Sequence, residues 1–213
     1  MLAQIVEPQR FPLLSELRAR LLRWRFYHSF RTDTEAPARQ PQVGTRTPAL
    51  AHDGRDLAAA LMTIDQIGDR EALHEAVAQA FPGARLELDA AGNRFSFQLR
   101  MPGLMRSLEP AEASDGTLRF LFLLAALLSP RPPPFLALNE PETSLHPAML
   151  RPLARLIGEA SRRGQIFVVT HSQPLAQMLE AEAGATTQLL EKHDGASRFA
   201  TPPVDRDRRD SKQ

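Results

Sequence analysis

The sequence predicts an α/β domain with a parallel sheet core, because strand-like and helix-like segments alternate through its second half. Segments 135–138 and 165–170 are short and almost wholly apolar, which is typical of strands buried in a parallel sheet. Segment 147–163 between them is amphipathic, and segments 173–181 and 186–191 continue as a helix and a further strand. This order of strand, helix, strand, helix and strand predicts the parallel fold.

Composition restricts the classes to which the chain can belong. Its 213 residues are 43% hydrophobic, which is enough for about one domain or one and a half. The 26 Lys and Arg nearly balance 25 Asp and Glu, which does not favour an obligate nucleic-acid binder. The absence of cysteine excludes disulfides and zinc–thiolate sites. No apolar run is long enough for a membrane span and residues 1–10 do not resemble a signal peptide, so we expect a cytoplasmic protein without a membrane partner.

The first part of the chain, residues 1–55, is predicted to contain a basic helix and an extended insert segment. Leucines from Leu13 to Leu22, together with Trp24, follow helical spacing, and Pro12 or Ser15 can start the helix. Four arginines between positions 18 and 25 make it basic. They could contact DNA, but a solvated amphipathic face is the commoner reason for such a charge run. The proline-containing segment 32–53 is predicted to be loop-like.

The second part, residues 56–110, is predicted to contain a helical pair and a β-hairpin. Segments 56–66 and 69–81 suit helices with aspartate caps and glycine stops. The caps and stops are Asp56, Gly68, Asp69 and Gly83. Segments 85–89 and 94–100 alternate apolar and polar residues around a short loop, which predicts a hairpin. Segment 101–112 allows a short further strand.

The third part, residues 111–202, carries the α/β pattern, and its first candidate binding segment begins the helix predicted at 116–128. Free backbone N–H groups and the helix dipole favour an anion at such a helix start. Ser114 and Thr117 add hydroxyl donors, and Gly116 would let a phosphate approach closely. An ordinary helix cap at Ser114 or Asp115 explains the same residues. The charged and polar residues 203–213 are predicted to form a disordered tail.

The second candidate segment follows the strand at 135–138. Asn139 and Glu140 stand at the carboxyl end of this strand, where open α/β sheets bind ligands. A carboxylate there can orient or deprotonate a water molecule that attacks a γ-phosphate. The Asn139 oxygen can help to hold Mg²⁺ through its water shell. A polar loop that closes a buried strand is the alternative interpretation.

The third candidate is His171, which ends the next apolar strand. Its place beside the preceding strand makes it a candidate γ-phosphate sensor, although a lone histidine at a strand end is commonly structural. The six histidines are scattered without the spacing of metal ligands, so no structural metal is expected.

In order and spacing, these segments together resemble ABC-type ATPases, including RecF-like bacterial AAA family ATPases and chromosome-maintenance proteins. Residues 114–117 resemble the signature motif in its Ser-Asp-Gly form, and residues 136–140 resemble Walker B. Residues 143–147 resemble the D-loop in its Leu-His-Pro form, and His171 resembles the switch histidine. The resemblance is specific over residues 112–179, and a weaker one to the insert region of such ATPases covers residues 24–83.

The resemblance implies that the chain is the carboxy-terminal part of a P-loop NTPase, an ABC-type head, with a helical and loop insert and a hairpin. It implies that Glu140 and His171 are catalytic, that Asn139 is the metal position, and that ATP and Mg²⁺ are used. The ATP contacts that it implies are Ser114, Asp115, Gly116, Thr117, Ser144 and His146. Family heads sandwich two nucleotides between them, so a head-to-head homodimer or a partner chain bearing a P-loop is expected.

Two features depart from the family pattern. No Gly-x-x-x-x-Gly-Lys-Ser/Thr motif occurs in the sequence, so the cradle and the lysine for the β-phosphate are missing. We therefore expect a truncated or split gene product whose loop lies upstream, or a loop supplied by another chain. Asn139 stands where most relatives have aspartate, and its neutral oxygen is a poorer magnesium ligand. Glu142 could compensate, unless its side chain points at solvent.

Three functions stay open on the sequence alone. The first is ATP hydrolysis, which we do not expect this chain to carry out alone. The second is a non-hydrolysing, head-like interaction module that dimerises with a complete ATPase. The third is a remnant whose exposed sheet edges favour aggregation. DNA repair, phage defence and toxin systems all stay open as biological roles, because a fold does not determine a function.

Overall fold

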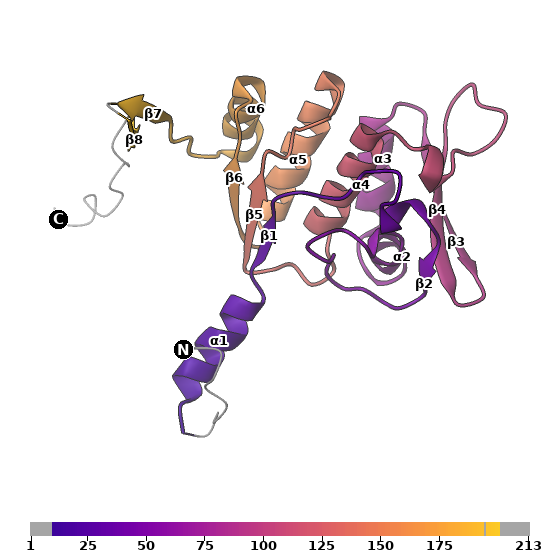
Figure 1. Cartoon of the computed structure of the whole chain (residues 1–213), viewed down its shortest axis with the longest axis horizontal. Helices are drawn as coiled ribbons and strands as arrows, with labels where there is room; N and C mark the ends of the chain where they lie inside the picture. The colour runs from indigo at the N-terminus through magenta and orange to yellow at the C-terminus, as the bar shows by residue number, and fades with distance from the viewer. Residues whose placement is uncertain (1–9, 194, 201–213) are drawn as a thin grey trace.

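The computed structural model describes residues 10–193 and 195–200 and arranges a parallel sheet, a group of helices and an antiparallel sheet side by side (Figure 1). The parallel sheet has the strand order β1-β5-β6. Its strands are β1 (Arg25–Tyr27), β5 (Phe135–Asn139) and β6 (Gln165–Val169). The predicted parallel α/β core is therefore present.

Helix α4 (Asp115–Leu127) lies at the centre of the hydrophobic core. Every residue from Leu118 to Leu127 is buried, as expected of a helix that is apolar on all sides. Helix α5 (Leu150–Ser161) contacts α4, and α6 (Gln173–Ala183) contacts α5. Helix α5 also contacts β6, so it connects α4 to the parallel sheet.

Helices α2 (Leu57–Ile67) and α3 (Arg70–Ala80) confirm the predicted helical pair. Asp69 caps α3 by accepting the amide of Ala72. Asp56 occupies the predicted N-cap position of α2, but its side chain makes no capping hydrogen bond, because its carboxylate accepts the amide of Ala51 instead.

The predicted hairpin is also confirmed. It consists of β3 (Arg85–Ala91) and β4 (Arg94–Arg100), and β2 (Gln42–Val43) adds to the β4 edge. Segment 101–112 forms no strand of its own, but an isolated bridge between Leu99 and Leu108 and the 3-10 helix η3 (Pro110–Glu112). Two further short 3-10 helices are η2 (Pro37–Arg39) and η4 (Pro147–Met149).

The first helix is shorter than its apolar pattern predicts. Helix α1 (Pro12–Leu22) extends away from the body and contains no buried residue (Figure 1). Trp24 lies outside it, and the next residues form β1, which pairs in parallel with β5. A three-residue strand has too few positions to show a period of two, and its pairing partner is more than a hundred residues away.

The strand predicted at 186–191 as part of the parallel sheet is wrong. β7 (Leu190–His193) instead pairs antiparallel with β8 (Ala196–Phe199), and all their described side chains are exposed. An apolar pattern indicates a strand but does not specify its partner, which here is the neighbouring segment. The tail at 203–213 lies outside the described residues.

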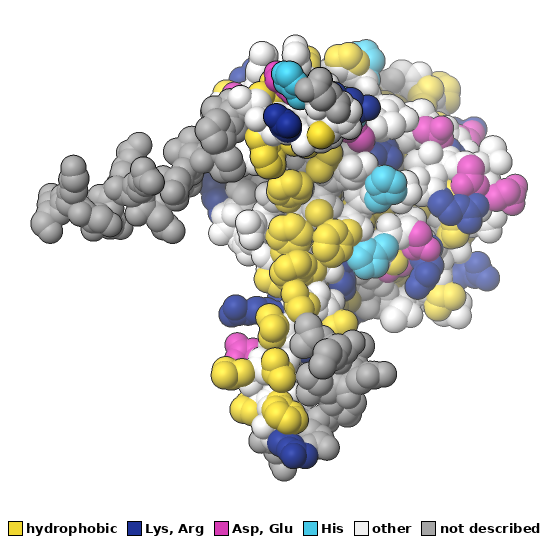
Figure 2. Space-filling view, turned by 60° about the vertical axis from the view of Figure 1, so that its left-hand side comes forward, with side chains coloured by type: hydrophobic (Ala, Val, Ile, Leu, Met, Phe, Trp, Pro, Cys, Tyr) yellow, Lys and Arg dark blue, Asp and Glu magenta, His cyan; other side chains and the backbone are white. Residues whose placement is uncertain are grey.

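One face of the parallel sheet is open, which contradicts the expectation that segment 165–170 is a fully buried strand. Phe167 is 56% exposed and Val169 is 42% exposed. The register places Phe26 beside Ala137, and Ala137 beside Phe167. We call this surface the open sheet face; it consists of Trp24, Phe26, Phe135, Ala137, Phe167 and Val169. Hydrophobic side chains form a band that continues to α1 (Figure 2).

Within the described part of the chain, no helix is both long enough and apolar enough to cross a membrane.

Candidate functional site

The turn after β5 holds Glu140 in an unusual backbone conformation. Glu140 has a φ of 47°, in the left-handed region that residues other than glycine rarely occupy. Its N–H donates to the carbonyl of Val169 at 2.8 Å. Its own carbonyl accepts a hydrogen bond from Nη2 of Arg119, also at 2.8 Å. The backbone of Glu140 is therefore held on both sides.

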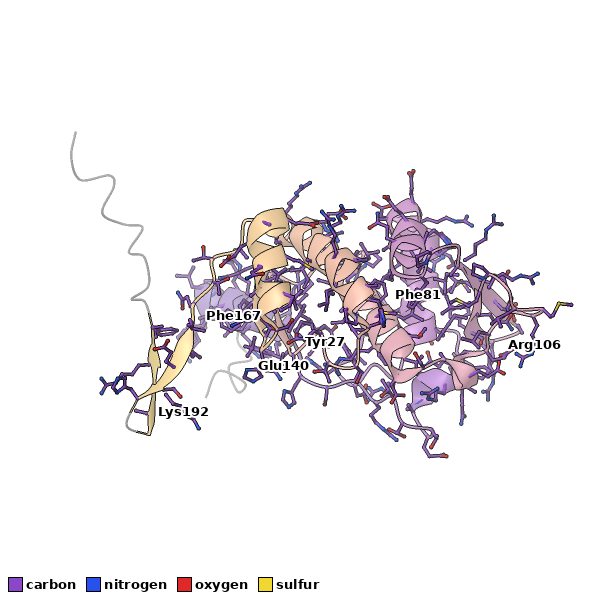
Figure 3. All side chains as sticks on the ribbon, turned by 90° about the horizontal axis from the view of Figure 1, so that it is seen from above. Tyr27, Phe81, Arg106, Glu140, Phe167 and Lys192 are labelled. Carbon is purple, nitrogen blue, oxygen red and sulfur yellow. The ribbon has the colours of Figure 1, made fainter. Side chains whose placement is uncertain are left out.

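Glu140 and His171 lie together at the carboxyl edge of the sheet. His171 Nε2 is 3.4 Å from Glu140 Oε1, and the His171 side chain is 92% exposed. Glu140 is partly shielded, with 24% of its side chain exposed. Figure 3 labels Glu140 near the middle of the molecule, between the hairpin that carries Lys192 and the loop that carries Arg106. Both predicted catalytic side chains are thus exposed to solvent, His171 almost fully and Glu140 in part.

Glu142 connects the loops that follow β5 and β6. Its Oε1 accepts the Thr170 hydroxyl at 2.5 Å and the N–H groups of His171 and Ser172 at 3.2 Å. Its Oε2 is buried and has no hydrogen-bond partner among the described residues. Glu142 therefore does not point at solvent, and its Oε1 is occupied in orienting the His171 loop.

Asn139 lies on the side of β5 that belongs to the open sheet face. Alternation along the strand places it with Phe135 and Ala137. The described residues contain no group of three His, Cys, Asp or Glu side chains that could hold a metal. Protein magnesium sites commonly combine one or two oxygen ligands with water and substrate phosphates. The oxygens of Asn139 and Glu140 fit such a shared site, but they do not form a complete protein cage.

The predicted signature residues begin α4 as a helix cap. Ser114 Oγ accepts the amide of Thr117 at 3.1 Å and lies 2.8 Å from the Thr117 hydroxyl. Asp115 pairs with Arg39, with 2.9 Å between Oδ1 and Nη2. The capping interpretation is therefore correct, and it leaves Ser114 and Asp115 exposed at the helix start.

Gly116 brings the start of α4 against the predicted D-loop. A Cβ at Gly116 would lie 2.4 Å from the carbonyl oxygen of Ser144. Ser144 itself has a φ of 64°. The close approach of two backbones therefore requires glycine here, independently of any phosphate. His146 is exposed and its Nδ1 accepts the amide of Ala148, which starts η4.

Arg39, which no sequence pattern predicts as a site residue, connects the insert segment to the start of α4. Its guanidinium donates to the carbonyls of Thr32, Asp33, Pro110, Ala111 and Ala113 and to the carboxylate of Asp115. Only 10% of its side chain is exposed. Nothing in the sequence distinguishes this arginine from its many neighbours, because its partners are mostly backbone atoms far along the chain.

Arg119 is the second missed residue, and here the sequence contains a signal. It is the only charged residue in the apolar run from Leu118 to Leu128. Arg119 is 9% exposed, and burial lowers the pKa of its guanidinium while nearby Glu142 and Glu140 oppose that shift. An isolated charge in a buried helix is costly, so it indicates a specific partner. That partner is the Glu140 carbonyl.

Comparison with known proteins adds a family match. A family model described as "AAA domain, putative AbiEii toxin, Type IV TA system" matches residues 2–176. The Chromosome partition protein Smc of Mycobacterium tuberculosis is 30% identical over 115 residues, which is 51% of this chain and 10% of that protein. The chain therefore spans about a tenth of the length of the curated relatives that it matches.

Solved structures show the same fold at low identity. One, described as "Structural biochemistry of ATP-driven dimerization and DNA stimulated activation of SMC ATPases", aligns with a TM-score of 0.52 and 20% identity. It covers 65% of this chain and 84% of that chain. The "Crystal structure of the SmcHead bound to the C-winged helix domain of ScpA" aligns with a TM-score of 0.51 and 20% identity, over 71% of this chain and 54% of that one. The predicted ABC-type head fold is confirmed.

Proposed function

The chain belongs to this AAA-domain family of ABC-type ATPases. From that membership we propose that the chain is the carboxy-terminal half of an ATPase head, which carries the general base and the signature motif. The other half supplies the P-loop and comes from an upstream segment or from a partner chain. Without the P-loop backbone and lysine, nothing in this sequence holds the β-phosphate. We expect hydrolysis only when the two halves meet.

The observation that carries the proposal is the pairing of Glu140 with His171 at an accessible strand edge. Glu140 accepts a proton from the attacking water, and its partial burial limits competition from bulk solvent. The exposed imidazole of His171 contacts the γ-phosphate. Glu142 keeps the His171 loop in place through the three hydrogen bonds that its Oε1 accepts.

Magnesium, when bound, would neutralise charge on the phosphates during transfer. Asn139 would contribute its amide oxygen toward the water shell of the ion, with Glu140 beside it. Because Asn139 is neutral, most of the ligands must come from water and from the nucleotide itself.

The start of α4 contacts a nucleotide that is bound by another chain. Ser114 and Asp115 are exposed there, at the end of a helix where backbone N–H groups favour anions. The contact between Gly116 and the Ser144 carbonyl places the D-loop beside the signature, so Ser144 and His146 can face the same partner. A head-to-head homodimer or a partner bearing a P-loop satisfies this geometry.

The open sheet face supports the need for a further lobe. Parallel sheets are normally covered on both faces, whereas Phe26 and Phe167 are more than half exposed here. The face runs directly to Asn139 at its carboxyl edge. A lobe that covers it would therefore bring its own loop beside Glu140 and His171.

The test is ATP turnover by the chain together with a P-loop-bearing segment from upstream DNA or a neighbouring gene. Glu140→Gln should lower turnover about 100- to 10,000-fold, because it removes the general base. Glu159→Gln, a matched change on the exposed side of α5, should leave turnover unchanged. Equal turnover in the Glu140→Gln variant and the parent would refute the role of the base.

A second candidate function is a non-hydrolysing module that stimulates a complete ATPase. Asn139 and the missing P-loop favour it, because both weaken this chain's own nucleotide site. In that case Ser114→Arg should reduce the turnover of the complete partner, whereas Glu140→Gln should not. If Glu140→Gln reduces turnover and Ser114→Arg does not, the non-hydrolysing module is excluded.

A further inference from the structure

Arg119 is a buried charge whose presence in α4 is not explained by packing. Only 9% of the residue is exposed, and its neighbours on the helix are buried apolar side chains. Burying a charged group costs free energy unless the group is paired and hydrogen-bonded, so a lone buried arginine adds little to the stability of the fold. A reason other than stability is needed for its presence.

The contacts of Arg119 are not those of an ion pair. No carboxylate within the described residues lies close enough to form a salt bridge with it, and its Nε is buried without a hydrogen-bond partner. Its guanidinium lies 6.0 Å from the Phe30 ring. Its Nη2 donates to the carbonyl of Glu140 at 2.8 Å. Among the described residues, the guanidinium therefore donates its hydrogen bond to a single backbone carbonyl.

The backbone at Glu140 needs such support. Glu140 has the left-handed φ of 47°, which is unfavourable for a residue with a side chain. It also precedes Pro141, and a residue before proline prefers an extended conformation. A relaxed Glu140 would turn away from its present conformation, and its carboxylate would move relative to His171. The hydrogen bonds at its N–H and at its carbonyl oppose that relaxation.

We propose that Arg119 is a positioning residue that holds the Glu140 turn in its left-handed conformation and thereby keeps the Glu140 carboxylate beside His171. This inference rests on the proposed role of Glu140 as the general base. Arg119 itself reaches the backbone of Glu140 and not the reacting atoms.

The test compares three variants of the full chain. Arg119→Met fills the same space without a donor, so the fold and its melting temperature should be kept. Arg119→Lys keeps a shorter donor. Arg163→Gln is the matched control, because Nη2 of Arg163 donates to the Leu127 carbonyl at the opposite end of α4.

The first readout is amide hydrogen exchange, which needs neither nucleotide nor P-loop. In Arg119→Met, the N–H groups of Glu140 and His171 should exchange at least about tenfold faster, because the turn opens locally, while the interior of α4 stays protected. Arg119→Lys should be intermediate, and Arg163→Gln should match the parent. Unchanged exchange at Glu140 in Arg119→Met would overturn the proposal.

The second readout is turnover with the P-loop-bearing segment. Arg119→Met should lower kcat about 100-fold through misplacement of the base, with KM for ATP unchanged. Adding Pro141→Ala should restore part of kcat, because alanine removes the steric penalty on Glu140. A purely structural role predicts no such rescue.

The outcomes separate the two proposals. If Glu140→Gln has no effect on turnover, the proposed function fails, and the exchange experiment still decides whether Arg119 holds the turn. If Glu140→Gln abolishes turnover but Arg119→Met does not change kcat, the Arg119 proposal alone fails. Should Arg119→Met not fold, Arg119→Lys decides, since parental exchange and parental kcat in that variant would overturn the proposal.

Discussion

At the scale of single residues, two largely buried arginines support the candidate site by donating hydrogen bonds to backbone carbonyls. Arg119 reaches the turn at Glu140, and Arg39 reaches the loop that leads into Ser114. Charged donors make stronger hydrogen bonds than neutral ones, and a planar guanidinium can serve several carbonyls at once. Residues that touch no ligand can therefore determine where the candidate ligand contacts lie.

We predict that Arg39→Ala lowers the free energy of unfolding by about 2–4 kcal/mol, because several carbonyls lose a buried charged donor. The loss should appear in denaturant unfolding, and amide exchange at residues 113–117 should rise. Arg31→Ala is the control, because its ion pair with Asp33 is about half exposed on both sides, and such pairs contribute little. Equal stability of Arg39→Ala and the parent would contradict the prediction.

At the scale of elements, one carboxylate on α6 forms ion pairs with two arginines on α5. Glu182 on α6 lies 2.7 Å from Nε of Arg151 and 2.9 Å from Nε of Arg155, both on α5. The hydrogen bonds from these two arginines hold the pKa of Glu182 below its ordinary value of 4.5. This connection supports α6, which directly follows the His171 loop.

The pH dependence of that connection follows from the lowered pKa of Glu182. A carboxyl group whose folded pKa is lowered contributes stability above its unfolded pKa and loses that contribution as pH falls through its folded pKa. Glu182→Gln should therefore melt at a lower temperature than the parent at neutral pH. The difference should shrink as pH falls below about 4. Melting curves across this range test it, with exposed Glu180→Gln as the control.

At the scale of the whole molecule, the most distinctive feature is the open sheet face. Large apolar patches that stay exposed commonly mark interaction surfaces or cause aggregation. Here Trp24, Phe26 and Phe135 contact one another across two strands, with ring centroids 4.8–6.3 Å apart. The same surface supports the proposed lobe and also explains why a remnant of such a head would aggregate.

We predict that Phe167→Gln reduces self-association of the 213-residue chain without lowering its melting temperature, because the side chain is already 56% exposed. Burying a phenylalanine contributes about 1.5–3 kcal/mol, so association through this face should weaken roughly 10- to 100-fold. Light scattering across a concentration series measures it. Phe199→Gln on β8, where the phenylalanine is 50% exposed, is the control. If both changes reduce self-association equally, the open sheet face is not the surface through which the chain associates.

Some parts of the fold and candidate site could be predicted because their signals are local. Ser114 followed by a long apolar run specifies a capped, buried helix, and the four apolar residues Phe135–Leu138 specify a strand that ends at Asn139, directly before Glu140. Asp69 likewise caps its helix as predicted. The family pattern then placed Glu140 and His171 on neighbouring strand ends, and the structure brings them within 3.4 Å. Their catalytic roles stay predictions.

Other parts depend on contacts that no local pattern encodes. β1 is a strand because β5 lies beside it, and residues 190–193 pair with the next segment instead of joining the parallel sheet. Gly116 is needed because the Ser144 carbonyl approaches it, which only the packed chain shows.

The sequence by itself determined the α/β class, the helix starts and the residues that the family pattern marks, because capping and hydrophobic periodicity act over a few neighbouring positions. The tertiary structure alone decided that one sheet face is open, that Glu142 orients the His171 loop, and that Arg39 and Arg119 hold the candidate site. Those outcomes depend on which distant backbone atoms come within hydrogen-bonding distance, and such distances exist only after the chain has packed.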